Sequence, residues 1–281
     1  MGTLYIVGTP IGNLEDLTFR AARILGQVDL VAAEDTRVTR KLLSHLGIHV
    51  PLTSYHEHNR QARIPELLAA LESGDVALVT DAGMPGISDP GDALVSQAAA
   101  AGFKVVPVPG ASALTTALAV SGFPADTFLF LGFLPRRGKD RRARLQAVAP
   151  SPWTLALFEA PHRLQSTLWD LQSVLGDREI AVCRELTKLH EEVFRGAIAQ
   201  AIEHFRAPRG EFVLLVKGAE GGTPPAKSAT PDLDLARQQL AELKVSGVRA
   251  KEAVTVVAGA TGLPRQMVYR LWLEVGRAAQ D

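Results

Sequence analysis

Residues 76–91 read VALVTDAGMPGISDPG, a short apolar run followed by a long loop that is rich in glycine and proline. The apolar run lacks alternation, which is typical of a strand that is covered on both faces of its sheet. Asp81 and Gly83 follow at the carboxyl end of this strand, the edge at which open α/β sheets bind ligands. Ser88 or Asp89 is predicted to cap the helix that comes next. The stretch predicts an α/β fold, and its carboxylates favour a ribose, ammonium or sulfonium ligand unless the loop is an ordinary strand-to-helix turn.

The composition limits the class of protein. The chain has 281 residues, 47% of them hydrophobic, which suits two modest domains with an appendage. Its single cysteine, Cys183, excludes an internal disulfide and indicates a reducing compartment. No apolar run approaches the ~20 residues of a membrane span, so we expect a cytoplasmic protein that does not bind membranes. The 30 basic and 30 acidic residues balance, so a nucleic-acid substrate would have to be held by local basic patches.

Strand-like and helix-like segments alternate through the first half of the chain, which predicts a largely parallel sheet. Residues 2–12, GTLYIVGTPIG, predict a strand and a turn but lack the G-x-G-x-x-G spacing, which excludes a dinucleotide-binding domain of that type. Residues 13–16 are predicted to cap the first helix. The second strand ends in Glu34 and Asp35, followed by Arg37. These charged residues form either part of a site or, through Asp35, only the cap of the next helix.

Two further loops of the first half are candidates for a site. Residues 54–59 read SYHEHN, but two histidines without a third firm ligand are weak evidence for a metal, so we predict no metal site. A polar loop or a substrate-facing loop explains this segment better. Residues 109–113, PGASA, open a helix of small residues. There Ala111 and Ser112 would let a ligand approach free backbone N–H groups.

The second half again shows strands whose carboxyl ends carry charge. The first of them ends in PRRGKDRR, residues 135–142, the densest basic run of the chain. A charge run is usually a solvated helix face, but its place at a strand end in a neutral chain also favours contacts with phosphates. Strands are also predicted at residues 153–158, 180–183 and 212–216. The candidate RNA contacts in the basic run are Arg136, Arg137, Lys139, Arg141 and Arg142.

The end of the chain predicts a separate helical module. We expect domains at residues 1–122 and 123–220, a breaker-rich linker at residues 221–232, and a tail over residues 233–281. The tail holds three helical stretches, and a short turn of helix-turn-helix type separates the last two. Such a pair is more often a packing unit than a DNA reader. Alternatively, four apolar residues of the tail could pack on the preceding domains: Leu235, Leu240, Trp272 and Leu273.

The successive sequence blocks together resemble one family. They read GTPIGNLEDLTFRA, AEDTR, SYHEHN, TDAGMPGISDPG, VPGASA, GFLPR, FEAPHRL, RELTK and GEFVLLV, and they span about residues 2–218. They resemble the ribosomal small-subunit RNA methyltransferases of the tetrapyrrole methylase superfamily, which methylate a cytidine 2′-hydroxyl. TDAGMPGISDPG together with FEAPHRL is highly specific, whereas PGASA alone would indicate only the superfamily.

This resemblance implies an α/β fold with two α/β/α domains of the tetrapyrrole methylase (class III methyltransferase) type. It implies S-adenosylmethionine in the cleft between them, 16S rRNA in the small ribosomal subunit as substrate, and a homodimer. The implied cofactor-binding residues are Pro10, Asp81, Gly83, Pro85, Ser88, Asp89, Ala111, Ser112, Phe158, Glu159 and His162. For catalysis we expect Glu34 or Asp35 as the base, with Lys188 and Arg163 as the cations that stabilise charge on the oxygen or bind the neighbouring phosphate. A tetrapyrrole methyltransferase and a non-enzymatic nucleic-acid binder remain as alternatives.

Overall fold

A computed structural model describes residues 1–222, 233–246, 248–261 and 263–277. The chain divides into two compact units, Met1–Thr223 and residues 224–281, and each is described by itself. Nearly all of the predicted linker at residues 221–232 lies outside the described residues. Within them, no helix is long and apolar enough to cross a membrane.

The first half of the first unit is built on a five-stranded sheet in the order β3-β2-β4-β1-β5. All of its neighbouring strands are parallel, as predicted from the alternation of strands and helices. Every residue of β4 is buried, which confirms that its apolar run is covered on both faces. The strands are β1 (Thr3–Val7), β2 (Leu30–Ala33), β3 (Leu52–Ser54), β4 (Val76–Val79) and β5 (Lys104–Val108).

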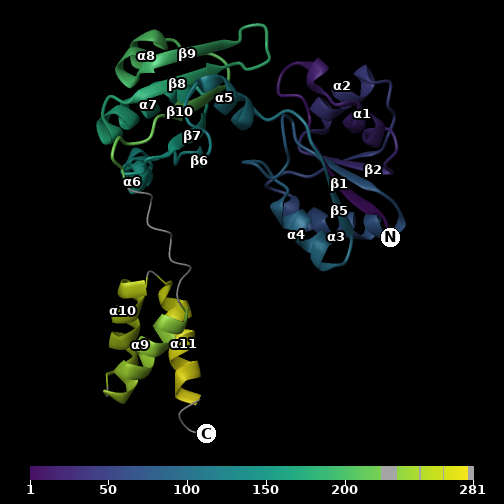
Figure 1. Cartoon of the computed structure of the whole chain (residues 1–281). Coiled ribbons are helices and arrows are strands. Elements are labelled where there is room, and N and C mark those ends of the chain that lie inside the picture. The colour runs from purple at the N-terminus through teal and green to yellow at the C-terminus, as the bar shows by residue number, and fades with distance from the viewer. Residues whose placement is uncertain (223–232, 247, 262, 278–281) are drawn as a thin grey trace. The chain divides into compact units, whose positions relative to one another are not determined.

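Helices cover both faces of this sheet, so the first half is an α/β/α sandwich (Figure 1). On one face, α1 (Phe19–Leu25) and α2 (Thr36–His45) pack on Val31, Ala33 and Val79. On the other face, α3 (Arg60–Ser73) and α4 (Asp92–Ala100) pack on Ala32 and Leu78. The alternation of side chains along β2 and β4 therefore supplies one core on each side of the sheet.

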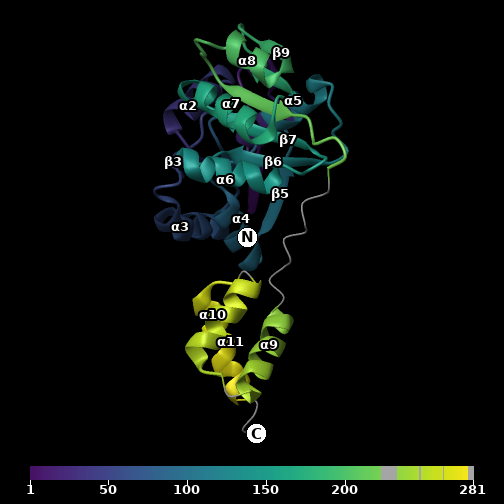
Figure 2. The same cartoon turned by 90° about the vertical axis from the view of Figure 1, so that its left-hand side faces the viewer.

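The second half is built on a mixed five-stranded sheet in the order β6-β7-β10-β8-β9. β6 and β7 are parallel, and the other neighbouring strands are antiparallel. α6 (Gly138–Val148), α7 (Pro161–Leu175) and α8 (Ile198–His204) cover one face, as Figure 2 shows for α6 and α7. The strands are β6 (Phe128–Phe133), β7 (Thr154–Glu159), β8 (Glu179–Arg184), β9 (Glu192–Ala197) and β10 (Phe212–Val216).

The opposite face of the second sheet is covered by α5 (Ala113–Ser121). Leu114 and Leu118 of this helix are buried in one cluster with Ala181 and Leu215 of the second sheet. A domain boundary was expected at residues 122–123, after α5. The packing instead joins α5 to the second half, because its apolar side chains are buried there. The chain therefore passes from the first half to the second before α5 begins.

Capping differs from the expectation at two helices. Thr18 caps α1 by accepting a bond from the N–H of Ala21, whereas Asn13 caps a short 3-10 turn over Leu14–Asp16. Neither Ser88 nor Asp89 caps α4. Its N-cap is Gly91, which has no side chain to cap with, because Pro90 and Gly91 separate Asp89 from the helix. The side chains of Ser88 and Asp89 are therefore not used to cap the helix.

The second unit is helical, with α9 (Leu233–Val245), α10 (Ala250–Thr261) and α11 (Arg265–Arg277). Leu240 and Trp272 belong to its own apolar core. Leu273 is 51% exposed. The side chain of Leu235 lies outside those that the structure describes.

Candidate functional site

The loops that follow β1, β4 and β5 are held together at the carboxyl edge of the first sheet. Thr9 and Gly83 exchange two backbone hydrogen bonds, of 3.0 and 3.1 Å, as an isolated antiparallel bridge. Gly83 has φ +82°, a conformation that favours glycine. A Cβ on Gly8 would lie 2.7 Å from the Cα of Gly110, so these loops approach more closely than larger residues allow. The loop that was predicted to bind a ligand is therefore fixed at this edge.

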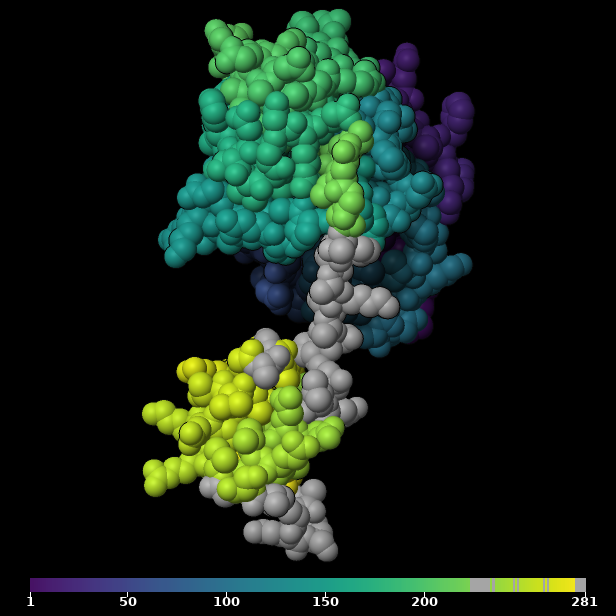
Figure 3. All heavy atoms as spheres, turned by 60° about the vertical axis from the view of Figure 1, so that its left-hand side comes forward, coloured from purple at the N-terminus to yellow at the C-terminus, as the bar shows by residue number. Residues whose placement is uncertain are grey.

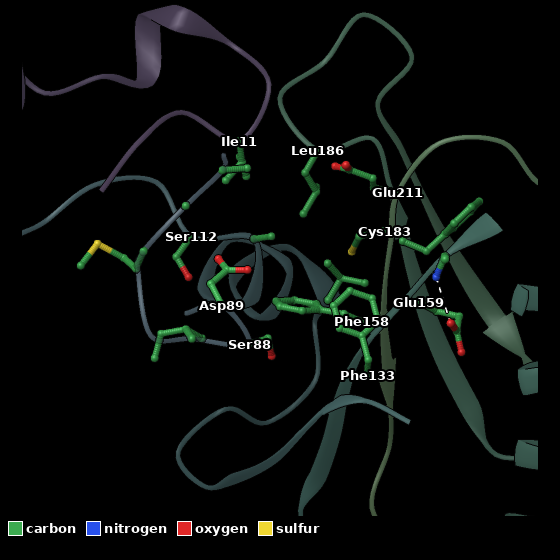
Figure 4. Close-up of a pocket in the computed structure, with 18 of the residues that line it drawn as sticks. Ile11, Ser88, Asp89, Ser112, Phe133, Phe158, Glu159, Cys183, Leu186 and Glu211 are labelled. Carbon is green, nitrogen blue, oxygen red and sulfur yellow. Dashed lines mark hydrogen bonds between the residues drawn. The ribbon is translucent and has the colours of Figure 1, made fainter. Parts of the chain in front are cut away.

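A cavity of about 450 Å³ lies between this edge and the second sheet. The close-up shows Ser88, Asp89 and Ser112 on one side of it and Phe133, Phe158 and Cys183 on the other (Figure 4). The two halves that form its walls are in contact in the space-filling view (Figure 3). The wall residues are Ile11, Ala82, Gly83, Met84, Ile87, Ser88, Asp89, Ser112, Ala113, Phe133, Phe158, Glu159, Ala160, Pro161, Cys183, Leu186, Glu211, Phe212 and Val213. We call this the first cavity.

The first cavity suits a cation. Among the described residues, the charged side chains in its walls are all acidic: Asp89, Glu159 and Glu211. Burial raises the pKa of Asp89 to about 6, and the negative charges of Glu34 and Asp81 add to this effect. A cationic ligand would lower that pKa by stabilising the carboxylate. The rings of Phe133 and Phe158, whose centroids are 5.7 Å apart, add the π-faces to which cations are attracted.

Two helices begin at the first cavity. α5 has Ser112 as its N-cap and α7 has Ala160, and neither residue makes a side-chain capping bond. Their first-turn N–H groups suit an anionic group such as a carboxylate. Glu159, which is 2% exposed, accepts bonds from Thr167 Oγ1 at 2.5 Å and from its neighbour's N–H at 2.9 Å. Glu159 therefore stabilises the start of α7, which is a structural role.

Six of the predicted cofactor-binding residues line the first cavity: Gly83, Ser88, Asp89, Ser112, Phe158 and Glu159. Pro10 and Asp81 line a neighbouring cavity instead. Pro85, Ala111 and His162 line neither: Pro85 is buried and His162 is exposed. Six of the eleven implied residues therefore share one cavity, and the other five lie outside it.

The neighbouring cavity, here called the second cavity, has a volume of about 370 Å³. It lies between the loop after β1, helix α2 and the loop that joins β8 to β9. Three residues line both cavities: Ile11, Ala82 and Glu211. The remaining walls of the second cavity are Thr9, Pro10, Gly12, Leu14, Val38, Thr39, Lys41, Leu42, Thr80, Asp81 and Lys188. The two cavities are thus neighbours with a common wall.

The predicted acidic candidates form a chain of carboxylates bonded to backbone. Glu34 Oε2 accepts the N–H of Asp81 at 3.3 Å, and Asp81 Oδ1 accepts the N–H of Asp35 at 3.0 Å. Burial raises the pKa of Glu34, whereas the hydrogen bonds from Arg37 lower the pKa of Asp35 to about 2. Asp35 also caps α2. Asp35 is therefore a poor base, and neither Glu34 nor Asp35 lines a cavity.

The two cationic candidates have different positions. Lys188 Nζ donates to Glu185 at 3.0 Å and to Glu211 at 2.8 Å, and the lysine lines the second cavity. Its loop reaches the first half, because Thr187 Oγ1 accepts the N–H of Asn13. Arg163 lines neither cavity. It donates to the carbonyl of Leu134 at 2.7 Å and lies 3.4 Å from Glu159, so it joins β6 to the start of α7.

The basic run divides into exposed and buried arginines. Arg136, Arg137 and Lys139 are exposed, as is Arg142. Arg141 is instead 6% exposed and donates from Nε to Asp170 at 2.6 Å. Because its guanidinium is enclosed between α6 and α7, Arg141 is not placed to contact RNA, contrary to the expectation.

Several cavity residues were missed by the sequence reasoning. Phe133, Leu186 and Glu211 all lie at the ends of strands of the second sheet, and this position was the signal that could have identified them. Cys183 also lines the first cavity. Burial raises the pKa of its thiol to about 11, so it is not a thiolate at neutral pH.

The fold and the site define a class: an α/β protein with two sheets and, between them, a cavity whose charged wall residues are acidic. The family model for tetrapyrrole (corrin/porphyrin) methylases matches residues 3–202. Among solved structures, the chain is similar to the uroporphyrin-III-C-methyltransferase from Thermus thermophilus, with a TM-score of 0.55 and 22% identity. That likeness covers 77% of this chain and 94% of the other, and it supports the fold.

Two curated relatives are called ribosomal RNA small subunit methyltransferase I. The one from Synechocystis is 48% identical over 279 residues, which cover 98% of this chain and 99% of the relative. The one from Thermotoga maritima is 52% identical over 223 residues, which cover 78% of this chain and 100% of the relative. The chain therefore belongs to the tetrapyrrole methylase family and, within it, to the ribosomal RNA small subunit methyltransferase I family. The resemblance drawn from the sequence blocks is confirmed.

Proposed function

We propose that this chain transfers a methyl group from S-adenosylmethionine to the ribose 2′-hydroxyl of a cytidine in 16S rRNA. The support is the identity of 44–52% to relatives that carry the ribosomal RNA methyltransferase name, with matches over 96% or more of this chain in several of them. The methylases of this family use S-adenosylmethionine. The small ribosomal subunit is accordingly the partner that supplies the substrate.

The first cavity is the observation that carries this proposal, because its chemistry fits S-adenosylmethionine. The cofactor is a cation at sulfur and at its amino group and an anion at its carboxylate. Asp89 and the rings of Phe133 and Phe158 suit the cationic end, and the starts of α5 and α7 suit the carboxylate. When bound, S-adenosylmethionine supplies a methyl group activated by positively charged sulfur.

The protein must chiefly align the attacking hydroxyl with the methyl group and accept one proton from that hydroxyl. The attacking oxygen must lie ~3–3.5 Å from the methyl carbon, in line with the sulfur. A neutral ribose hydroxyl is a poor nucleophile, so a carboxylate beside it assists the reaction by accepting its proton. Of the predicted catalytic residues, Lys188 lines the second cavity. There its Nζ donates a hydrogen bond of 2.8 Å to the Glu211 carboxylate.

RNA contacts are proposed for the exposed cations of the basic run. Arg136, Arg137 and Lys139 precede or begin α6, and Arg142 lies one turn further along, where it also bonds Asp170 at 3.1 Å. We further propose a homodimer, from the family resemblance, and a cytoplasmic location, which fits a ribosomal substrate and a single cysteine. The helical second unit is proposed to add contacts with the ribosomal substrate.

The direct test incubates the purified protein with S-adenosylmethionine and small ribosomal subunits from a strain without this enzyme. Mass spectrometry of the digested 16S rRNA should then show one new 2′-O-methylcytidine, and its yield at limiting cofactor should fall when Asp89→Asn replaces the wild type. Uroporphyrinogen serves as the second substrate, because the solved fold neighbour is a uroporphyrin methyltransferase. Methylation of uroporphyrinogen without methylation of the subunit would overturn the proposal in favour of the tetrapyrrole alternative.

A further inference from the structure

The second cavity adjoins the first and shares part of its wall. Ile11, Ala82 and Glu211 form the common wall, and in Figure 4 Ile11 and Glu211 lie at the end of the first cavity opposite Phe133. Ala82 contributes only a methyl side chain to this wall. A group in the second cavity can therefore approach a ligand in the first across this wall.

The walls of the second cavity include an uncovered apolar surface. Leu14 and Val38 both line it, and they remain 46% and 41% exposed. Pro10 and Leu42 extend the same surface. Large exposed apolar residues gathered in one concavity are typical of a binding site. The volume of about 370 Å³ is suited to a small planar group with its sugar.

Positive charge lies along the side of the second cavity that α2 provides. Lys41 lines the cavity and is exposed, and Arg40 beside it is also exposed. Arg37 lies one turn earlier, where it bonds Asp35 at 2.6 Å. In a chain without net charge, an apolar concavity next to exposed cations matches the base and the phosphate of a nucleotide.

At the common wall, one carboxylate faces both cavities. Among the described residues, Glu211 is the titratable side chain that lines both, and Lys188 fixes it from the second cavity at 2.8 Å. A hydroxyl that approaches the first cavity from the second meets a wall made of Ile11, Ala82 and this carboxylate. Glu211 is therefore placed to accept a hydrogen bond from that hydroxyl and to direct its oxygen.

We propose that the second cavity is the acceptor site, which binds the target ribonucleotide after it is turned out of the RNA chain. Its base lies against Leu14 and Val38, a flanking phosphate lies at Lys41, and its 2′-hydroxyl points to Glu211 at the common wall. This assignment rests on the proposed RNA methylation, and it adds a site on α2 to the contacts of the basic run. Enzymes that do chemistry on a base commonly extrude the nucleotide into such a pocket.

Two substitutions test the site. Lys41→Glu reverses the charge at the cavity, and Val38→Trp fills it from an exposed helix position. For both we measure the affinity for small-subunit RNA without cofactor, the KM for RNA, and the affinity for S-adenosylmethionine by calorimetry. Lys41→Glu should weaken RNA binding about tenfold and reduce its dependence on salt. Val38→Trp should raise the KM for RNA or lower kcat about tenfold, and neither should change cofactor affinity more than about twofold.

Matched controls separate this site from general effects. Lys104→Glu makes the same charge change at the amino end of β5, the edge of the parallel sheet opposite the cavities. Val120→Trp adds the same bulk to a valine of α5 that is 38% exposed. If the wild type methylates the RNA but the test variants behave like their controls, the acceptor site is refuted alone. If the variants lose cofactor binding, the second cavity belongs to the cofactor site. A wild type that neither binds nor methylates the RNA refutes the proposed function as well.

Discussion

Nε of Arg141 donates a hydrogen bond of 2.6 Å to Oδ2 of Asp170, and the two side chains are only 8% and 11% exposed. Arg142 donates to the other carboxylate oxygen at 3.1 Å. Arg141 and Arg142 lie on α6 and Asp170 lies on α7, so these bonds join two helices on the same face of the second sheet. Part of the basic run therefore stabilises the fold, and the rest remains exposed.

Replacing Arg141 should reduce stability. Arg141→Ala leaves the buried Asp170 with one partner, so we expect a loss of about 3 kcal/mol in the free energy of unfolding. Denaturation in urea provides the measurement. Arg144→Ala, an exposed position on the same helix, is the control and should change this free energy by less than about 0.5 kcal/mol. Equal stability of the two variants would show that Arg141 does not support the fold.

Replacing the exposed cations should weaken RNA binding and leave the stability of the fold unchanged. The triple change of Arg136, Arg137 and Lys139 to Ala should weaken binding of small-subunit RNA and lower its salt slope by roughly 0.7–0.9 for each phosphate that these side chains neutralise in the wild type. The affinity for S-adenosylmethionine should stay unchanged, because none of the three lines a cavity. Titrations at several salt concentrations test this directly. An unchanged salt slope would mean that the run is only a solvated surface.

The affinity for S-adenosylmethionine should fall when the pH is lowered through about 6. The pKa of Asp89 is raised to about 6 by burial, so the carboxylate is charged above this pH and neutral below it. A cation is favoured only by the charged form, which gives binding at pH 7 that weakens towards pH 5. Calorimetry with S-adenosylhomocysteine, which lacks the charge at sulfur, should show a smaller dependence.

Asp89→Asn extends the same prediction. We expect a loss of roughly 1.5–3 kcal/mol in the binding free energy of S-adenosylmethionine at pH 7, with little dependence on pH. Thermal denaturation of the free variant serves to show that it is folded. A wild-type affinity in a folded Asp89→Asn protein would remove Asp89 from the cofactor site.

The sequence predicted the elements with strong local patterns and missed those whose identity depends on packing. The apolar run of β4 identified a buried parallel strand correctly. β9 (Glu192–Ala197) was missed because it is an edge strand with no fully buried residue, so its sequence lacks a clear alternation. α8 has only seven residues and was missed as well. Whether α5 packs with the first or the second half of the unit depends on contacts between residues that are distant in sequence. No local sequence pattern contains this information.

Where strand ends and ligand chemistry coincide in the sequence, the predicted residues lie at a cavity. Asp89 and Ser112 belong to loops whose composition alone indicated a ligand, and both line the first cavity. Arg141 had the same sequence signal as its exposed neighbours, because burial against Asp170 is decided by another helix. Glu211 immediately precedes β10 in the sequence. Its position between the two cavities arises from the packing of the two sheets. The spacing of residues along the sequence does not reveal this packing.

The second unit should be dispensable for cofactor binding. Leu240 and Trp272 are buried in a core of its own, together with Val257 and Val268, so this unit does not need the first to cover its apolar face. The Thermotoga relative is matched over its whole length by 78% of this chain, and the first unit, Met1–Thr223, makes up a similar share of the 281 residues. All residues that line the two cavities lie in the first unit.

A protein that ends at Gly222 should therefore fold and bind S-adenosylmethionine with an affinity within about twofold of the full chain. Its methylation of small subunits should fall, with a raised KM for the subunit, because a tethered module adds contacts by raising the effective concentration at a large partner. Calorimetry, thermal denaturation and methylation of subunits measure the three quantities on both proteins. A truncated protein with a lower melting temperature and weaker cofactor binding would show that the second unit supports the first. Full activity on subunits would instead show that the second unit takes no part in the reaction on this substrate.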